Sequence, residues 1–144
     1  MRALLDIHVI IALFDPDHAF HERAHVWWSV NRIQGWASCP LTENGAVRIM
    51  SHPNYSRILQ FSPGELISRI GEFADQTDHA FWGDSISLRD EGIFERDRMH
   101  STRQITDLYL LALAVSHQGR LVTFDEGIPI SAVRNAKITN LCVL

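Results

Sequence analysis

Four acidic residues stand at positions where metal-assisted chemistry would need them. Asp6 follows a short apolar run and Asp125 follows the apolar residues 121–124, so each carboxyl group comes at the end of a candidate strand. In open α/β sheets, ligands bind beyond the carboxyl ends of the strands, where the strand order reverses. Two carboxylates in one cleft repel each other, and a divalent cation between them resolves that conflict. Glu43 and Asp107 add carboxyl groups in the first turns of predicted helices, where exposed backbone N–H groups favour anions.

Each acid also has a purely structural explanation. Glu43 and Asp107 could serve only as first-turn acids, which stabilise a helix by under about 1 kcal/mol. Asp125 could simply begin a turn with Gly127. Asp6 is harder to explain in this way, because an acid inside an apolar run has no turn or solvent-facing side to account for it. Asp6 therefore carries the most weight in the functional interpretation.

The elements that must position these acids alternate between strands and helices. Short apolar runs predict strands at residues 2–6, 36–39, 79–82, 121–124 and 138–144. Helices are predicted in the run that ends before residue 15, at 18–33, from 40 to near 51–53, from 62 onwards and at 108–117. Residues 84–105 are expected to be irregular. This alternation predicts a three-layer α/β fold with a mostly parallel sheet and right-handed crossovers.

Two of the helices carry more detailed expectations. Asp17 is expected to cap the helix at 18–33, and Phe20, Ala24 and Trp27 share one face at helical spacing, which predicts that this face packs in the core. The helix at 108–117 is apolar on nearly every side, which indicates burial against the sheet. At least half of the four tryptophans are expected to be buried.

Four short stretches of the chain are informative through their order and spacing. They are residues 4–8 (LLDIH), 41–48 (LTENGAVR), 106–114 (TDLYLLALA) and 121–125 (LVTFD), and together they span most of the chain. In this order they resemble the PIN-domain nucleases, and among them the VapC-type toxin ribonucleases of bacterial toxin–antitoxin pairs. Each stretch alone is a weak signal, but four in the family's order, in a chain of the family's usual size, are fairly specific.

The resemblance implies a sheet ordered 3-2-1-4-5, in which Asp6 and Asp125 become neighbours. It implies that Asp6, Glu43, Asp107 and Asp125 form an acidic quartet holding one or two Mg²⁺ or Mn²⁺ ions, supported by the Thr123 hydroxyl. Oxygen-only ligands suit these hard cations. The implied activity is metal-dependent hydrolysis of RNA phosphodiester bonds. The implied partners are a second copy of the chain, with which it forms a homodimer, and a cognate antitoxin that places a basic side chain in the acidic cleft.

One residue departs from the pattern of the family. The family usually has Asn or Ser two residues after the first acid, where this chain has His8. The His8 side chain is expected beside Asp6, where it could hydrogen-bond a metal-bound water or an acidic ligand. Because an imidazole titrates near neutrality, His8 could modulate metal binding as an asparagine cannot. The alternative is that His8 only fills space beside the site.

Several other interpretations compete with a nuclease. His18, His21 and His25 share one face of a predicted helix and could seat Zn²⁺, although no nearby acid or cysteine completes the site. A phosphoacceptor receiver domain needs a lysine beyond a late strand, but the only lysine, Lys137, precedes the last one. A haloacid-type phosphatase needs Asp-x-Asp, where this chain has Asp-Ile-His. A catalytically impaired PIN-like binding module is the remaining alternative, and cleavage of RNA in Mg²⁺ but not in EDTA distinguishes it.

Length and composition limit the other possibilities. A chain of 144 residues with 46% hydrophobic and 21% charged residues predicts one globular domain over residues 1–144. The net charge of −4 excludes a general basic coat for nucleic acid. Cys39 and Cys142 form no metal-binding pair, and no apolar run is long enough for a membrane span or is followed by a signal-peptide cleavage site. These features predict a cytoplasmic protein.

Overall fold

The computed structural model describes residues 1–144, and a five-stranded parallel sheet forms its centre. The strand order is β3-β2-β1-β4-β5, and every neighbouring pair is parallel. The strands are β1 (Ala3–Leu5), β2 (Trp36–Ser38), β3 (His79–Phe81), β4 (Arg120–Thr123) and β5 (Leu141–Val143). This order and the α/β class confirm the expected fold, and the sheet is wholly rather than mostly parallel.

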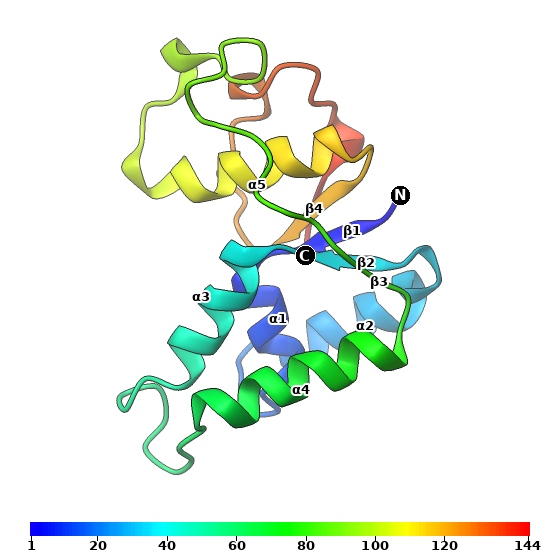
Figure 1. The fold of residues 1–144 in the computed structure, drawn as a ribbon, viewed down its shortest axis with the longest axis vertical. Coiled ribbons are helices and arrows are strands. Elements are labelled where there is room, and N and C mark those ends of the chain that lie inside the picture. The colour runs from blue at the N-terminus through cyan, green and yellow to red at the C-terminus, as the bar shows by residue number, and fades with distance from the viewer.

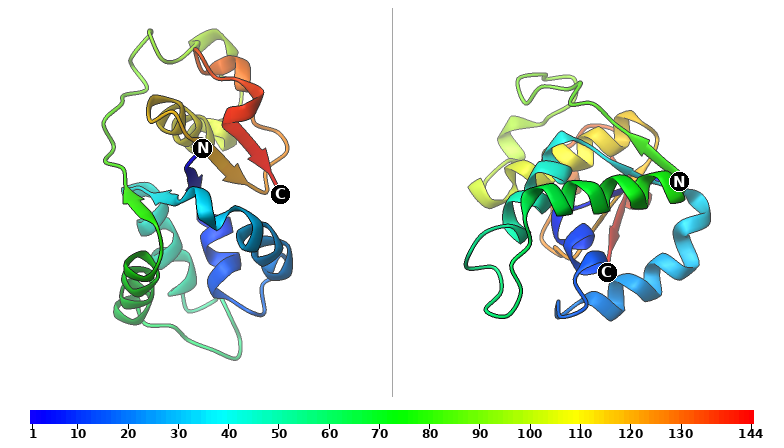
Figure 2. Two further views of the ribbon diagram at one scale, coloured as in Figure 1. Left: turned by 90° about the vertical axis from the view of Figure 1, so that its right-hand side faces the viewer. Right: turned by 60° about the horizontal axis from the view of Figure 1, so that its bottom comes forward.

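Helices cover both faces of the sheet and make three layers (Figures 1 and 2). One face carries α1 (Ile7–Phe14), α2 (His21–Asn31), α3 (Pro40–Met50) and α4 (Pro63–Gln76), and the other carries α5 (Ile105–Ser116). Short 3₁₀ helices occur at Arg32–Gln34, Arg96–Arg98, Thr102–Gln104, Ile130–Ala132 and Ile138–Asn140. The segment expected to be irregular, residues 84–105, contains only short 3₁₀ helices up to residue 104, lies on the same side of the sheet as α5, and ends where α5 begins at Ile105.

The alternation of side chains along the strands builds a separate core on each face. Leu4 and Leu121 pack with α5, whereas Leu5 and Val122, the next residues along the same strands, pack with α1 to α4. Most of α5 is buried between the sheet and the loops outside it, which explains why its sequence is apolar all round. No helix is both long and apolar enough to cross a membrane.

The second helix differs from its predicted form. It begins at His21 instead of residue 18, and its N-cap residue, Phe20, makes no side-chain capping bond. The reason is a turn centred on Asp15, whose carboxylate accepts a hydrogen bond from the Asp17 N–H at 2.9 Å and whose carbonyl accepts one from the His18 N–H. Asp17 is therefore part of this turn and caps nothing.

The predicted core residues of this region are only partly correct. Ala24 is fully buried, but Phe20 is 39% exposed and lies outside the helix. Two of the four tryptophans, Trp36 and Trp82, are buried, as expected. The last strand begins at Leu141 instead of residue 138, because residues 138–140 form a 3₁₀ turn.

Candidate active site

Asp6 lies in the one-residue junction between β1 and α1. Its Oδ1 accepts a hydrogen bond from the Ile7 N–H at 2.7 Å, so Asp6 is the N-cap of α1. Its Oδ2 accepts a hydrogen bond at 2.7 Å from the hydroxyl of Thr123, the last residue of the adjacent strand β4. Asp6 therefore also has a structural role as a helix cap, which the apolar residues around it in the sequence did not indicate.

Thr123 connects this first acid to a second one. Its Oγ1 accepts a hydrogen bond from the Asp125 N–H at 3.1 Å while it donates to Asp6. The Asp125 carboxylate also accepts a hydrogen bond from the Gly127 N–H at 2.7 Å, the turn geometry considered from sequence. The turn does not bury the acid, because Asp125 stays exposed. One hydroxyl therefore joins the ends of β1 and β4 at the point where the strand order reverses.

A pocket of about 440 Å³ opens at these strand ends. Three carboxyl groups line it, those of Asp6, Asp125 and Asp107 from the first turn of α5, and no arginine or lysine lines it. The remaining lining residues are Ile7, His8, His18, Phe20, Thr106, Thr123 and Phe124. The structure thus brings three of the four predicted acids to one pocket, together with both predicted supporting residues.

Crowding of negative charge is visible in the pKa values of two of these acids. Burial first, and then the neighbouring carboxylates of Asp6 and Asp125, together raise the pKa of Asp107 from 3.8 to about 7. Burial also raises the pKa of Asp6, against the hydrogen bonds from Thr123 and Ile7, which lower it. The pocket therefore holds carboxyl groups that favour a proton or a cation.

The donor set of this pocket fits a hard divalent cation. All three acids offer oxygen ligands, and the pKa of Asp107 is raised by burial and by the two neighbouring carboxylates, whose charge a cation would neutralise. In this structure no three His, Cys, Asp or Glu side chains are arranged so that they could hold one metal ion. The fit therefore rests on the chemistry of the donors and on their electrostatics.

Glu43 does not line the pocket that the other three acids line. It lines a different pocket, of about 710 Å³, between α3 and α4. Its Oε1 accepts a hydrogen bond at 2.6 Å from the hydroxyl of Ser38, at the carboxyl end of β2. The Ser38 oxygen also lies 2.8 Å from Nε2 of His79 on β3, whose pKa is lowered by burial. Sequence reasoning missed this chain of three polar side chains, because its members come from three different elements.

The histidines considered as zinc ligands have other partners. His21 Nδ1 lies 2.7 Å from the Ala12 carbonyl oxygen, and His25 Nε2 lies 3.0 Å from that of Leu13. Both rings therefore satisfy carbonyl groups in the last turn of α1, which have no partner within that helix. His18 lies in the turn before α2, where its Nδ1 accepts a hydrogen bond from the Phe20 N–H. This arrangement disfavours the zinc interpretation.

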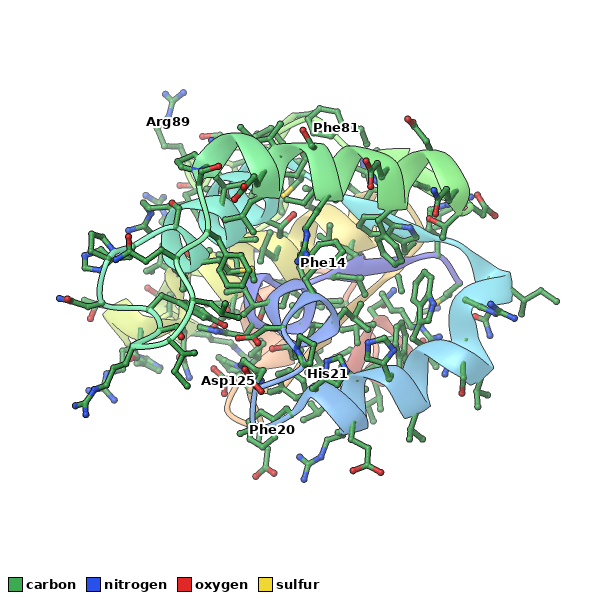
Figure 3. The ribbon with its side chains drawn as sticks, turned by 90° about the horizontal axis from the view of Figure 1, so that it is seen from below. Phe14, Phe20, His21, Phe81, Arg89 and Asp125 are labelled. Carbon is green, nitrogen blue, oxygen red and sulfur yellow. The ribbon has the colours of Figure 1, made fainter.

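Three aromatic side chains, those of His18, Phe20 and Phe124, line the pocket with the acids, and the sequence did not predict them as a group. Phe20 and Phe124 have ring centroids 4.8 Å apart, and His18 stacks on Phe124 at 6.4 Å with an angle of 20° between the rings. Figure 3 shows Phe20 and Asp125 on the same side of the molecule. The only sequence signal was the place of Phe124 directly between Thr123 and Asp125.

Comparisons with known proteins give full-length relatives. The chain is 44% identical to Ribonuclease VapC44 of Mycobacterium tuberculosis over 144 residues, the whole of both chains. It is 38% identical to Ribonuclease VapC39 of the same species over 132 residues, 92% of this chain and 94% of that protein. It is also 38% identical to Ribonuclease VapC38 over 128 residues, 88% of this chain and 86% of that protein. No protein-family model matches the chain.

Proposed function

The chain belongs to the VapC family of ribonucleases, and from this premise we propose that it is a Mg²⁺- or Mn²⁺-dependent endoribonuclease and the toxin of a toxin–antitoxin pair. Residues 1–144 would form a single nuclease domain. The observation that carries the proposal is the pocket at the ends of β1 and β4, which three carboxyl groups line without an arginine or lysine. Such a pocket repels an RNA phosphate unless a cation neutralises it.

The residues of the pocket have distinct roles in this proposal. A bound divalent cation would neutralise charge that develops on the phosphodiester and lower the pKa of an attacking water. Asp6 is held in place from both oxygens, by Thr123 and by the Ile7 N–H, so it offers a ligand of fixed orientation. Asp107 retains a proton up to a pH of about 7, and it would release that proton when a cation binds.

The second pair of acids completes the proposed quartet. Asp125 keeps an exposed carboxylate at the pocket, with its backbone N–H tied to Thr123. Glu43 is held by the Ser38 hydroxyl and would serve as the fourth acid from the neighbouring strand end. His8 lines the same pocket with an exposed side chain, and we retain it as a supporting residue that can contact water or RNA.

Cleavage of RNA in defined metal conditions tests this function. Purified protein should cut a single-stranded RNA in Mg²⁺ or Mn²⁺ and leave it intact in EDTA. Asp125→Asn should lower the rate by at least about 100-fold, the scale expected when one preorganised electrostatic group is lost. Glu126→Gln is the matched control, because it removes a neighbouring exposed charge that does not line the pocket. A wild-type rate in Asp125→Asn would contradict the assignment, and no metal-dependent cleavage by the wild type would favour the binding-module alternative.

The partners and the location follow from the same proposal. We expect a cytoplasmic protein, a homodimer and a cognate antitoxin whose basic side chain occupies the acidic pocket. Expression without the antitoxin should arrest growth, because the cleavage of RNA is then unopposed. Normal growth of cells that contain folded, wild-type protein would count against the toxin assignment.

A further inference from the structure

One side of the acidic pocket is bordered by aromatic rings, which we call the aromatic rim and define as His18, Phe20 and Phe124. All three line the pocket together with Asp6, Asp107 and Asp125. Neighbouring rings are tilted or nearly parallel, with centroids 4.8 to 6.4 Å apart. The rim therefore forms a continuous π surface that borders the carboxyl groups.

The rim is more than an outer part of the hydrophobic core. Phe20 is 39% exposed and belongs to neither of the two core clusters, although a ring of that size gains from burial. Phe124 is held between Thr123 and Asp125, so its position is fixed by the same backbone that positions the acids. Phe124 packs against the core while Phe20 reaches the surface, so tilted rings stay accessible beside the acids.

A positive charge lies just outside this rim. The guanidinium carbon of Arg23 is 5.0 Å from the centroid of the Phe20 ring, and Arg23 Nη1 donates to the Leu144 carbonyl oxygen at 3.4 Å. Arg23 does not line the pocket itself, so it places a cation against Phe20 without neutralising the carboxyl groups of the pocket wall. Carboxyl groups and rings therefore share the pocket, and one guanidinium contacts a ring of the rim.

We propose that the aromatic rim stacks an unpaired RNA base next to the phosphodiester bond that is cleaved, while Arg23 contacts a flanking phosphate. This inference rests on the proposed ribonuclease function and adds to it how the substrate is held. Accessible rings with an arginine against one of them match a nucleotide, because its base is flat and its phosphates are anionic. Every base has a π face, so stacking of this kind selects single-stranded over paired RNA without selecting one sequence.

The test removes the base and the ring separately and together. A single-stranded RNA oligonucleotide is cut by the wild type to map the cleavage site, and each nucleotide within two positions of it is then replaced by an abasic one. Phe20→Leu removes the ring but keeps an apolar side chain. Phe81→Leu is the matched control, since Phe81 is 56% exposed on β3 and lies on the opposite side of the molecule from Phe20 (Figure 3).

One abasic position should reduce kcat/KM for the wild type by about 5- to 150-fold, which corresponds to the usual 1–3 kcal/mol for one stacked base. Phe20→Leu should lose a similar factor on intact RNA and nothing more on that abasic RNA, because the same contact is missing already. Phe81→Leu should match the wild type on both substrates. Unchanged circular dichroism and melting of Phe20→Leu separate this effect from unfolding.

Three other outcomes would overturn the proposal. The losses from the abasic nucleotide and from Phe20→Leu could multiply, which would mean that ring and base act independently. Phe20→Leu could cleave RNA like the wild type but bind the antitoxin more weakly, which would assign the rim to a protein partner. If the wild type cleaves no RNA, the proposed function fails, and the rim is then tested by equilibrium binding of the intact oligonucleotide and of a fully abasic one of the same length. Equal affinities would overturn the stacking proposal.

Discussion

The charge of Asp107 should make the metal-free protein less stable as the pH rises. Its pKa is about 7 in the folded chain, against 3.8 for an ordinary aspartic acid, so between these values the folded state holds a proton that the unfolded chain has released. Stability is therefore lost as the pH rises through this window, and the full penalty is present above about pH 7. Asp107→Asn removes the charge and keeps the shape of the side chain.

The size of this effect follows from the pKa and from the exposure of the group. At about 1.4 kcal/mol per pH unit, a change from 3.8 to about 7 corresponds to roughly 4 kcal/mol at most. Asp107 is only partly buried, and water screens its interactions, so about 1–2 kcal/mol is the realistic gain. For a domain of this length, that gain raises Tm by about 2–8 °C. The lost first-turn charge of α5 opposes it by under about 1 kcal/mol.

Thermal melting in EDTA at several pH values measures this gain. Asp107→Asn should melt above the wild type at pH 8 and together with it near pH 4, where the wild-type carboxyl group is also neutral. Glu22→Gln is the matched control, because it removes an exposed first-turn acid from α2 without relieving any crowding. Adding Mg²⁺ should stabilise the wild type more than Asp107→Asn. A variant that melts at or below the wild-type temperature at pH 8 would refute the reasoning.

Two further substitutions test contacts near the site. Ser38→Ala removes the hydroxyl that holds Glu43, so the Mg²⁺ concentration for half-maximal RNA cleavage should rise by about 10-fold or more, the usual effect of losing a hydrogen bond that orients a metal ligand. An unchanged Mg²⁺ dependence would mean that Glu43 does not bind the metal or that Ser38 does not position it. Tyr55→Phe breaks the hydrogen bond from the Tyr55 hydroxyl to the buried carboxylate of Asp15, so urea unfolding should show a loss of about 1.5–3 kcal/mol. A loss below about 0.5 kcal/mol would mean that water replaces the hydroxyl.

Local signals in the sequence predicted most of the fold. The strand runs are short and apolar because both faces of a parallel sheet are covered. The start of α4 was marked by Ser62 and Glu65, which form a reciprocal capping box. The predicted start of α2 was wrong, because Asp15 forms a turn through its side chain and its carbonyl oxygen and this turn extends the loop before the helix.

The candidate site could likewise be predicted only in part from the sequence. The strand ends of Asp6 and Asp125 could be predicted, because parallel strands bring their carboxyl ends to one edge. The separate pocket of Glu43 could not, since its orientation depends on Ser38. The exposure of Phe20 could not be predicted either, because phenylalanine is one of the residue types that are most often buried.

The hydrogen bond between Thr123 and Asp6 joins residues 117 positions apart, and it imposes an order of events on synthesis. A ribosome delivers Asp6 early and Thr123 close to the end, so the strand end that Asp6 occupies stays without its neighbour for most of translation. The pocket cannot form until β4 pairs with β1. These strands are far apart in the sequence, and such pairings are slow to form. A chain cut short before residue 120 would therefore carry three of the four acids but lack both Asp125 and the strand that completes the pocket, so the cell is exposed to the activity only after β4 has been made.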